Sequence, residues 1–166
     1  MIDHIYNSIY QSGRTALLHM DEVRELGIRA VLRLDHKPFF SFPPAQWAED
    51  FTLLHLPFND GEGVPPGYFE RAMGFVHEQI TAGNRILIHC QMGVSRATTM
   101  TMAYLIEYEG MSLPQAFACV KHSRPIVYPH PVLLRSLVEY YHLPYTPQQI
   151  GQTDFLGKLL LEAEQG

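Results

Sequence analysis

The sequence has few cysteines, no concentrated positive charge and no long apolar segment. Two cysteines among 166 residues are too few for a disulfide framework. The formal charge is −5 and no run of Lys or Arg occurs, so the basic surface typical of proteins that bind nucleic acids or anionic membranes is missing. No uninterrupted apolar segment approaches the roughly 20 residues that span a bilayer. We therefore expect a soluble protein without nucleic-acid or membrane partners.

The start of the chain lacks the features of a secretory signal. The segment MIDHIYNSIYQSG has no basic region followed by an apolar run. Together with the scarcity of cysteine, this favours the reducing cytoplasm as the location. A chain of 166 residues, 46% of them hydrophobic, is long enough for one well-buried core and short for two. We expect a single domain.

Apolar patterns predict strands that alternate with helices, as in α/β proteins. The expected strands are a short edge strand in residues 5–13, buried strands in residues 28–35 and 51–58, and a strand in residues 85–89. The expected helices are residues 17–27, residues 69–83, one that begins at Arg96, and residues 114–122, 132–142 and 154–166. Residues 36–50 are too rich in proline and aromatics for a regular element. The predicted fold is a central, mostly parallel sheet flanked by helices.

Cys90 follows the strand 85–89 directly and precedes the helix at Arg96. In open α/β sheets, ligands bind at this edge. A loop that runs into a helix directs backbone N–H groups into one concavity, and Gly93 can adopt the positive φ angle that such an anion nest needs. The helix start and a nearby guanidinium favour a thiolate, and a guanidinium can bind two oxygens of a phosphate. We predict a nucleophile, Cys90, in a phosphate-binding loop that comprises Gln91, Met92, Gly93, Val94, Ser95 and Arg96.

The residues HCQMGVSR, from His89 to Arg96, resemble the His-Cys-five-residues-Arg motif of the protein tyrosine phosphatase superfamily. GVSR is especially similar to the dual-specificity protein phosphatases, and the resemblance continues from IYQSG through RAVLRL and YFERAM to a position near Tyr141. It implies the dual-specificity phosphatase fold and a phosphocysteine intermediate, with no cofactor. It also implies that His89 orients the cysteine loop through hydrogen bonds, although a merely buried histidine is the alternative.

The leaving oxygen of such a reaction needs a proton donor on the face opposite the thiolate. Asp60 follows the strand 51–58, whose carboxyl end shares an edge with Cys90 if the strands are parallel, and it opens the segment DGEGVPPG, a candidate lid. Glu62 is the other candidate. The resemblance favours Asp60, because the family's acid lies about thirty residues before its cysteine, commonly after an asparagine, and here ND is Asn59-Asp60.

Three classes of function are compatible with these residues. The favoured one is a phosphatase for phosphoproteins, acting on phosphotyrosine with or without phosphoserine and phosphothreonine. The second acts on phosphoinositides or RNA 5′ ends, whose enzymes tend to carry Lys or Arg inside the loop. The third is a non-catalytic phosphate-binding module, which would be free to lose Cys90 or Asp60. The variable loop positions disfavour the second class because they are uncharged: Gln91, Met92, Val94 and Ser95.

Other residues carry simpler interpretations. Cys119 occupies a helical apolar position and is expected to be an inert core cysteine. The histidines show no metal-ligand spacing, so no metal site is predicted. The aromatic residues of the connection are expected to pack against the domain, with contact to substrate as the alternative: Phe39, Phe40, Phe42 and Trp47.

The chain departs from the family pattern at two positions. Ala97 stands where the family usually has Ser or Thr, whose hydroxyl donates a hydrogen bond toward the cysteine sulfur. Pro129-His130 stands where Pro-Asn is common, a change expected to affect only a helix cap or a local hydrogen bond. The expected catalytic domain spans residues 1–145. Residues 146–166 are expected to be an extension that is helical and packs on the domain.

Overall fold

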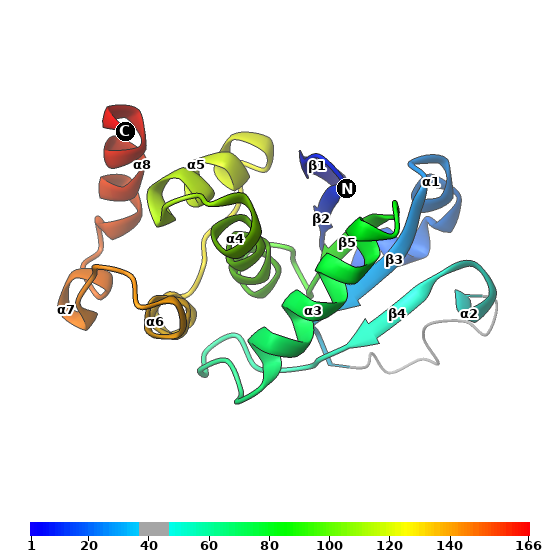
Figure 1. The fold of residues 1–166 in the computed structure, drawn as a ribbon, viewed down its shortest axis with the longest axis horizontal. Coiled ribbons are helices and arrows are strands. Elements are labelled where there is room, and N and C mark those ends of the chain that lie inside the picture. Colours follow the sequence, from blue (N-terminus) through cyan, green and yellow to red (C-terminus); the bar gives the residue numbers. More distant parts are fainter. Residues whose placement is uncertain (37–46) are drawn as a thin grey trace.

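A computed structural model describes residues 1–36 and 47–166, and its centre is a five-stranded sheet (Figure 1). The strands are β1 (Ile2–Tyr6), β2 (Ile9–Ser12), β3 (Ile28–Arg33), β4 (Thr52–His55) and β5 (Arg85–His89). Their order in the sheet is β1-β2-β5-β3-β4, and all neighbours are parallel except β1 and β2. The prediction of a central, mostly parallel sheet is confirmed. The carboxyl ends of β3, β4 and β5 meet at one edge.

The prediction of a single edge strand in residues 5–13 is wrong. This region contributes to a hairpin, in which Tyr6 pairs with Ile9 across a two-residue turn. Asn7 adopts a φ of 45°, which asparagine tolerates better than most residues and which tight hairpin turns require. Because β1 covers the outer side of β2, β2 is an interior strand, and all four of its residues are buried.

The region before β4 also differs from the prediction. The strand expected in residues 51–58 spans only Thr52–His55, and it lies at the edge of the sheet with no fully buried residue, because it pairs only with β3. Within the connection that was expected to be irregular, α2 (Trp47–Asp50) forms one helical turn, and Arg24 donates to the Asp50 carboxylate at 2.6 Å. Phe39, Phe40 and Phe42 lie outside the described residues.

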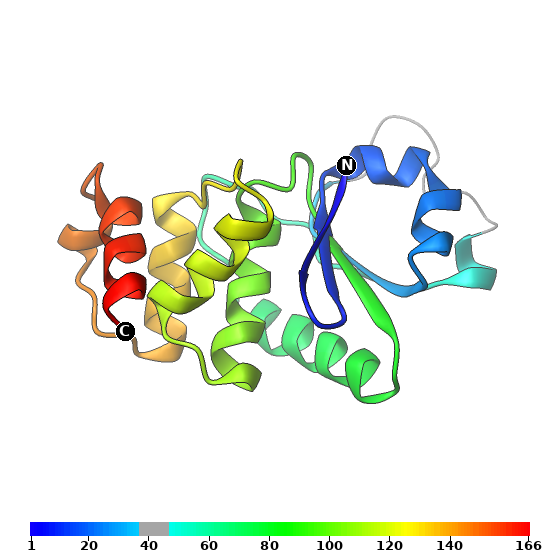
Figure 2. The ribbon, with the colours of Figure 1, turned by 90° about the horizontal axis from the view of Figure 1, so that it is seen from above.

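Helices cover both faces of the sheet (Figure 2). The smaller layer contains η1 (Arg14–Leu18, a 3-10 helix) and α1 (Met20–Glu25). The larger layer contains α3 (Tyr68–Thr81), α4 (Arg96–Glu109), α5 (Leu113–Ser123) and α6 (Pro131–Tyr141), followed outward by α7 (Pro147–Ile150) and α8 (Phe155–Gln165). The helix expected in residues 17–27 is split, because His19 has a φ of −125° and a ψ of 61° between η1 and α1.

The larger of two apolar cores lies between the sheet and α3–α6. Every residue of α4 from Arg96 to Leu105 is buried, so this helix packs on all sides against other elements. Cys90 belongs to the same core cluster. Both ends of the loop between β5 and α4 are therefore anchored in the buried core. None of the helices in the described parts of the chain is long and apolar enough to cross a membrane.

The last two helices bury apolar side chains against the domain. Thr146 caps α7 through its hydroxyl, which accepts from Gln149 N at 3.2 Å. In α8, Phe155 and Leu159 belong to the larger core, and α8 packs against α5. These contacts support the expectation that residues 146–166 pack on the domain, and we propose that these residues unfold together with it.

Replacing Leu159, which is 0% exposed, by alanine should lower the free energy of unfolding by about 2–4 kcal/mol, because a cavity would form against α5. Leu161 on the same helix is 58% exposed, so Leu161→Ala serves as the control and should change stability by no more than about 0.5 kcal/mol. Urea unfolding monitored by circular dichroism provides both values. Equal, small effects of the two substitutions would mean that α8 unfolds independently.

Candidate active site

The loop between β5 and α4 places the Cys90 thiol beside backbone N–H groups. Cys90 is 2% exposed, and Gly93 N donates to its Sγ at 3.3 Å. Gly93 has a φ of +68°, and a Cβ at this position would lie 2.4 Å from the carbonyl carbon of Ser12. Only glycine fits here, because both the backbone angle and the close approach to β2 exclude a side chain.

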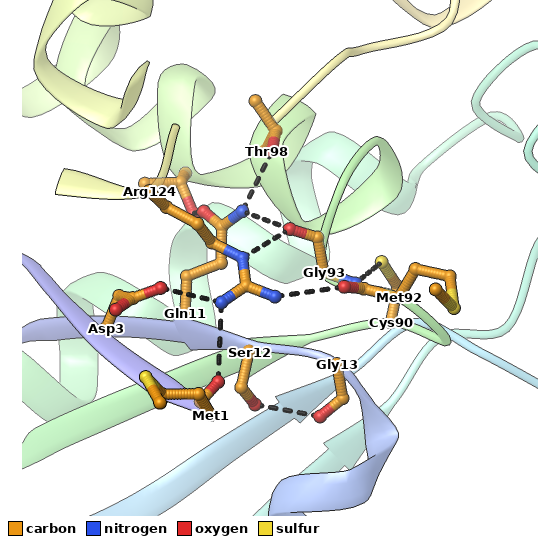
Figure 3. Close-up of polar contacts among 11 residues, drawn as sticks. Met1, Asp3, Gln11, Ser12, Gly13, Cys90, Met92, Gly93, Thr98 and Arg124 are labelled. Atoms are coloured by element: carbon orange, nitrogen blue, oxygen red, sulfur yellow. Dashed lines mark hydrogen bonds and ion pairs between the residues drawn. The ribbon is translucent and has the colours of Figure 1, made fainter. Parts of the chain in front are cut away.

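A buried arginine supports the loop from behind (Figure 3). Arg124 Nε donates to Gly93 O at 2.8 Å, and its Nη2 donates to Met92 O at 3.0 Å. Asp3 on β1 holds the same guanidinium at 2.7 Å. The C=O and N–H groups of a peptide unit point in opposite directions, so drawing these two carbonyls backward turns the N–H groups of Gly93 and Val94 toward the Cys90 side.

Gln11 is a second support that the sequence did not reveal. Its Nε2 donates to Gly93 O at 3.1 Å and to Thr98 Oγ1 at 2.8 Å, and its Oε1 accepts from Thr101 at 2.8 Å. Gln11 is fully buried in β2 and joins the loop to α4. Gln11 lies in the segment IYQSG and Arg124 lies directly after α5, both far from Cys90 in the sequence, and the residues around them did not predict a contact with the loop.

A cavity of about 360 Å³ opens in front of the loop. The structure thereby brings together Cys90, Arg96 and Asp60, the three residues for which the sequence predicts catalytic roles. Gly93 is buried and Glu62 is exposed, and neither lines the cavity. Tyr128 is an additional wall residue that the sequence did not indicate. The residues that line the cavity are Asp60, Cys90, Gln91, Met92, Val94, Ser95, Arg96 and Tyr128.

Asp60 is positioned by the parallel arrangement of β4, β3 and β5. The segment after β4 emerges at the same sheet edge as the Cys90 loop, and Arg96 Nη1 donates to Phe58 O at 2.8 Å, which ties the two together. Asp60 Oδ1 is buried and has no hydrogen-bond partner among the described residues. Because Asp60 lines the cavity, its carboxyl group lies beside the space that a ligand would occupy.

His89 is buried at the end of β5. Its Nδ1 donates to Cys90 O at 3.2 Å, while Nε2 has no partner in the described parts of the chain. Burial lowers the pKa of His89 from 6.5 to about 4, more strongly than the nearby Asp35 carboxylate raises it. His89 is therefore a neutral imidazole at neutral pH, and it holds the carbonyl at the start of the loop.

The hydroxyl groups of Ser95 and Thr98, near Ala97, have partners other than the Cys90 sulfur. Thr98 Oγ1 donates to Val94 O at 3.0 Å, and Ser95 Oγ accepts from His130 N at 2.8 Å. Among the described residues, Gly93 N is the one group that donates to the Cys90 sulfur. His130 also caps α6 through Nδ1, which accepts from Val132 N at 3.1 Å, so histidine takes over the role of a capping asparagine.

The second cysteine lies apart from this cavity. Cys119 on α5 is half-buried, and its Sγ lies 3.9 Å from Ile5 O. Burial raises the pKa of its thiol, which makes Cys119 less nucleophilic at neutral pH.

Sequence comparison identifies a family. The family "Dual specificity phosphatase, catalytic domain" matches residues 9–142. The chain is 31% identical over 138 residues to bovine dual specificity protein phosphatase 26, covering 82% of this chain and 65% of that protein. It is 26% identical over 142 residues to the phosphatidylglycerophosphate phosphatase PTPMT1 of Arabidopsis thaliana, covering 84% and 42%. The chain thus spans at most about two thirds of these relatives.

Solved structures share the fold. The active form of Tk-PTP superposes with a TM-score of 0.77 at 24% identity, covering 85% of this chain and 96% of that chain. DUSP15 gives a TM-score of 0.75 at 22% identity and covers 99% and 95%, so its match includes α7 and α8. The human tyrosine phosphatase-like serine/threonine/tyrosine-interacting protein gives 0.73 at 23% identity, with coverage of 85% and 95%.

The neutral state of His89 predicts how stability depends on pH. Below pH 6.5 this histidine binds a proton in the unfolded chain but not in the folded protein, so the free energy of unfolding should fall as the pH drops from 6.5 to about 4. The loss should reach about 3 kcal/mol, since one pKa unit corresponds to about 1.4 kcal/mol. Denaturant unfolding of wild type and His89→Asn between pH 7.5 and 4 measures it.

The stability advantage of the wild type over His89→Asn should shrink as the pH falls across this range. The control is His122→Asn, which removes an exposed histidine in place of the buried one. Parallel profiles for wild type and His89→Asn would show that His89 is not held neutral.

Proposed function

The chain belongs to the dual specificity phosphatase family, and we propose that it is a cysteine-dependent protein phosphatase that hydrolyses phosphotyrosine, with or without phosphoserine and phosphothreonine. One observation carries this proposal: a single cavity contains the Cys90 thiol, the Arg96 guanidinium and the Asp60 carboxyl group. These three groups can supply a nucleophile, an oxyanion clamp and a proton donor.

In the first step, the Cys90 thiolate attacks the phosphorus atom of the substrate. The bond between phosphorus and the ester oxygen breaks, and Asp60 donates its proton to that oxygen as it leaves. Arg96 and the loop N–H groups bind the other phosphate oxygens, where negative charge is concentrated in the transition state. The products of this step are the dephosphorylated residue, a phosphocysteine and the Asp60 carboxylate.

In the second step, a water molecule attacks the phosphocysteine. Asp60, now a carboxylate, accepts a proton from this water, the bond between sulfur and phosphorus breaks, and inorganic phosphate is released. His89 acts as a positioning residue, because its hydrogen bond to Cys90 O orients the start of the loop. The two-step reaction needs no cofactor.

A lipid phosphatase is the second candidate, because one relative carries the name phosphatidylglycerophosphate phosphatase. The uncharged loop positions support the protein substrate instead, since they offer no cation to a second phosphate group. Both cysteines are free, and a thiolate nucleophile persists best in a reducing compartment, which supports a cytoplasmic location.

Asp60→Asn should lower kcat by roughly two to four orders of magnitude on phosphotyrosine peptides, because their leaving oxygen needs a proton. On an activated aryl phosphate such as para-nitrophenyl phosphate the loss should be much smaller. Steady-state kinetics on both substrates provides the comparison. Glu62→Gln is the matched control and should be close to wild type, since Glu62 is exposed outside the cavity. Equal losses on both substrates would remove Asp60 from the role of acid.

Ala97 predicts that breakdown of the phosphocysteine limits turnover. A hydroxyl at this position would donate to the sulfur as it leaves, and such a bond to a charged group is worth roughly a ten- to hundredfold change in rate. Rapid mixing with an aryl phosphate should therefore release a burst of about one equivalent of phenol before a slower steady rate. Ala97→Ser should raise the steady rate and diminish the burst.

Cys90→Ser should abolish both the burst and the steady rate while retaining phosphate binding, which serves as the control for the covalent step. If the wild type shows no burst and Ala97→Ser leaves kcat unchanged, another donor, such as the Ser95 hydroxyl, stabilises the leaving sulfur.

A further inference from the structure

Exposed apolar side chains border the cavity on one side. Seven large hydrophobic residues are exposed in the described parts of the chain, and two of them, Met92 and Tyr128, line the cavity at 65% and 59% exposure. Ile126, at 60%, lies two residues before Tyr128. Large apolar groups are not expected to gather in water at one place by chance, and such groups commonly mark a binding surface.

The backbone holds these side chains in an outward orientation. Tyr128 N donates to Val94 O at 2.9 Å, so the segment after α5 lies against the cysteine loop. Val127 is fully buried between two exposed residues, and its N donates to Arg124 O at 3.2 Å across a turn at residues 125–126. Ile126 and Tyr128 thus flank an anchored, buried residue, and Tyr128 lines the cavity together with Met92.

Three cations of the neighbouring segments, Arg14, Lys121 and Arg124, have partners within the fold. Arg124 is bound to Asp3 and to the loop carbonyls, and Lys121 Nζ donates to Pro125 O at 2.6 Å. Arg14 lies 3.4 Å from the Asp35 carboxylate. These groups are not poised to bind a second phosphate, so the chemistry of this side of the cavity suits an uncharged, apolar group.

We propose that Met92, Ile126 and Tyr128 form an apolar rim that binds a large apolar side chain next to the phosphorylated residue of a peptide substrate. This inference rests on the proposed protein phosphatase function. When the phosphate occupies the loop, residues that flank the phosphorylated one must pass over the border of the cavity, at about 3.4 Å per residue. The rim then discriminates between peptides by the apolar area that it buries.

A peptide suits this rim better than a membrane. Stable association of a protein with a lipid surface draws on a larger apolar face together with basic residues. The rim consists of three side chains on a chain with a formal charge of −5, and Arg14 and Arg124 are each paired with a carboxylate within the fold.

The test uses two phosphotyrosine peptides of equal length and charge that carry either leucine or glutamine at the positions next to the phosphotyrosine. The wild type should prefer the leucine peptide by about tenfold in kcat/KM, the discrimination expected for an apolar contact of this size. Ile126→Gln and Tyr128→Gln should each reduce this preference to about twofold. Hydrolysis of para-nitrophenyl phosphate by Ile126→Gln should remain at the wild-type rate.

Leu161→Gln is the matched control, because Leu161 is equally exposed, at 58%, but lies on α8 away from the cavity. It should retain the full tenfold preference. Equal kcat/KM values for the two peptides in the wild type, or an unchanged preference in Ile126→Gln and Tyr128→Gln, would overturn the apolar rim and leave the phosphatase function intact.

A third substrate separates this failure from failure of the proposed function. If the enzyme hydrolyses para-nitrophenyl phosphate and a phosphatidylglycerophosphate in vesicles but neither peptide, the protein phosphatase proposal is wrong. The proposal that the rim binds a side chain of a peptide substrate is then wrong as well. Hydrolysis of both peptides with a leucine preference that depends on Ile126 supports both proposals.

Discussion

The backbone carbonyls of the cysteine loop must find partners inside the protein, and much of the site follows from this constraint. An anion nest turns consecutive N–H groups to one side, so the carbonyls of the same peptide units face the interior. Each carbonyl from residue 90 to residue 95 accepts a hydrogen bond. In chain order, the donors are His89, Arg14 N, Arg124, Gln11 with Arg124, Tyr128 N with Thr98, and Thr99. A buried carbonyl without a partner would cost about 1–3 kcal/mol.

These partners come from elements that are distant in sequence. The order β1-β2-β5-β3-β4 places β2 beside β5, so Gln11 and the backbone at Ser12 meet the loop directly. The end of α5 contributes Arg124, and Asp3 on β1 neutralises it. The hairpin, which pairs β1 with β2, thus has a role at the active site, because it brings a carboxylate to the arginine that orients the loop.

The chemistry of the cavity reflects how few charged groups reach it. Arg96 is the cation and Asp60 the acid among the lining residues, and the remaining walls are polar backbone or uncharged side chains. This composition suits a substrate that carries one phosphate group and makes apolar contacts. It is therefore consistent with both the proposed phosphatase activity and the apolar rim. The sulfur of Cys90 has a single hydrogen-bond donor among the described residues, Gly93 N. The absence of a hydroxyl at Ala97 is therefore expected to affect turnover.

The chemical groups of the site were determined by the sequence alone. Cys90, Gly93 and Arg96 lie within one strand-loop-helix unit, where local spacing decides which atoms converge. Asp60 was predicted from a longer separation, because parallel strands bring their carboxyl ends to one edge. Most helices and the strands β3 and β5 were also predicted, since their apolar periodicity is local.

Only the tertiary structure decided what surrounds these groups. The hairpin, the edge position of β4, the support by Gln11 and Arg124, and the wall formed by Tyr128 depend on which strands and segments become neighbours. The neighbouring sequence of a single polar or aromatic residue does not indicate which distant residue it will contact. Gln11, for example, binds Gly93, about eighty residues further along the chain. The contacts that shape the loop arise only when the sheet order and the packing of α5 bring those residues together.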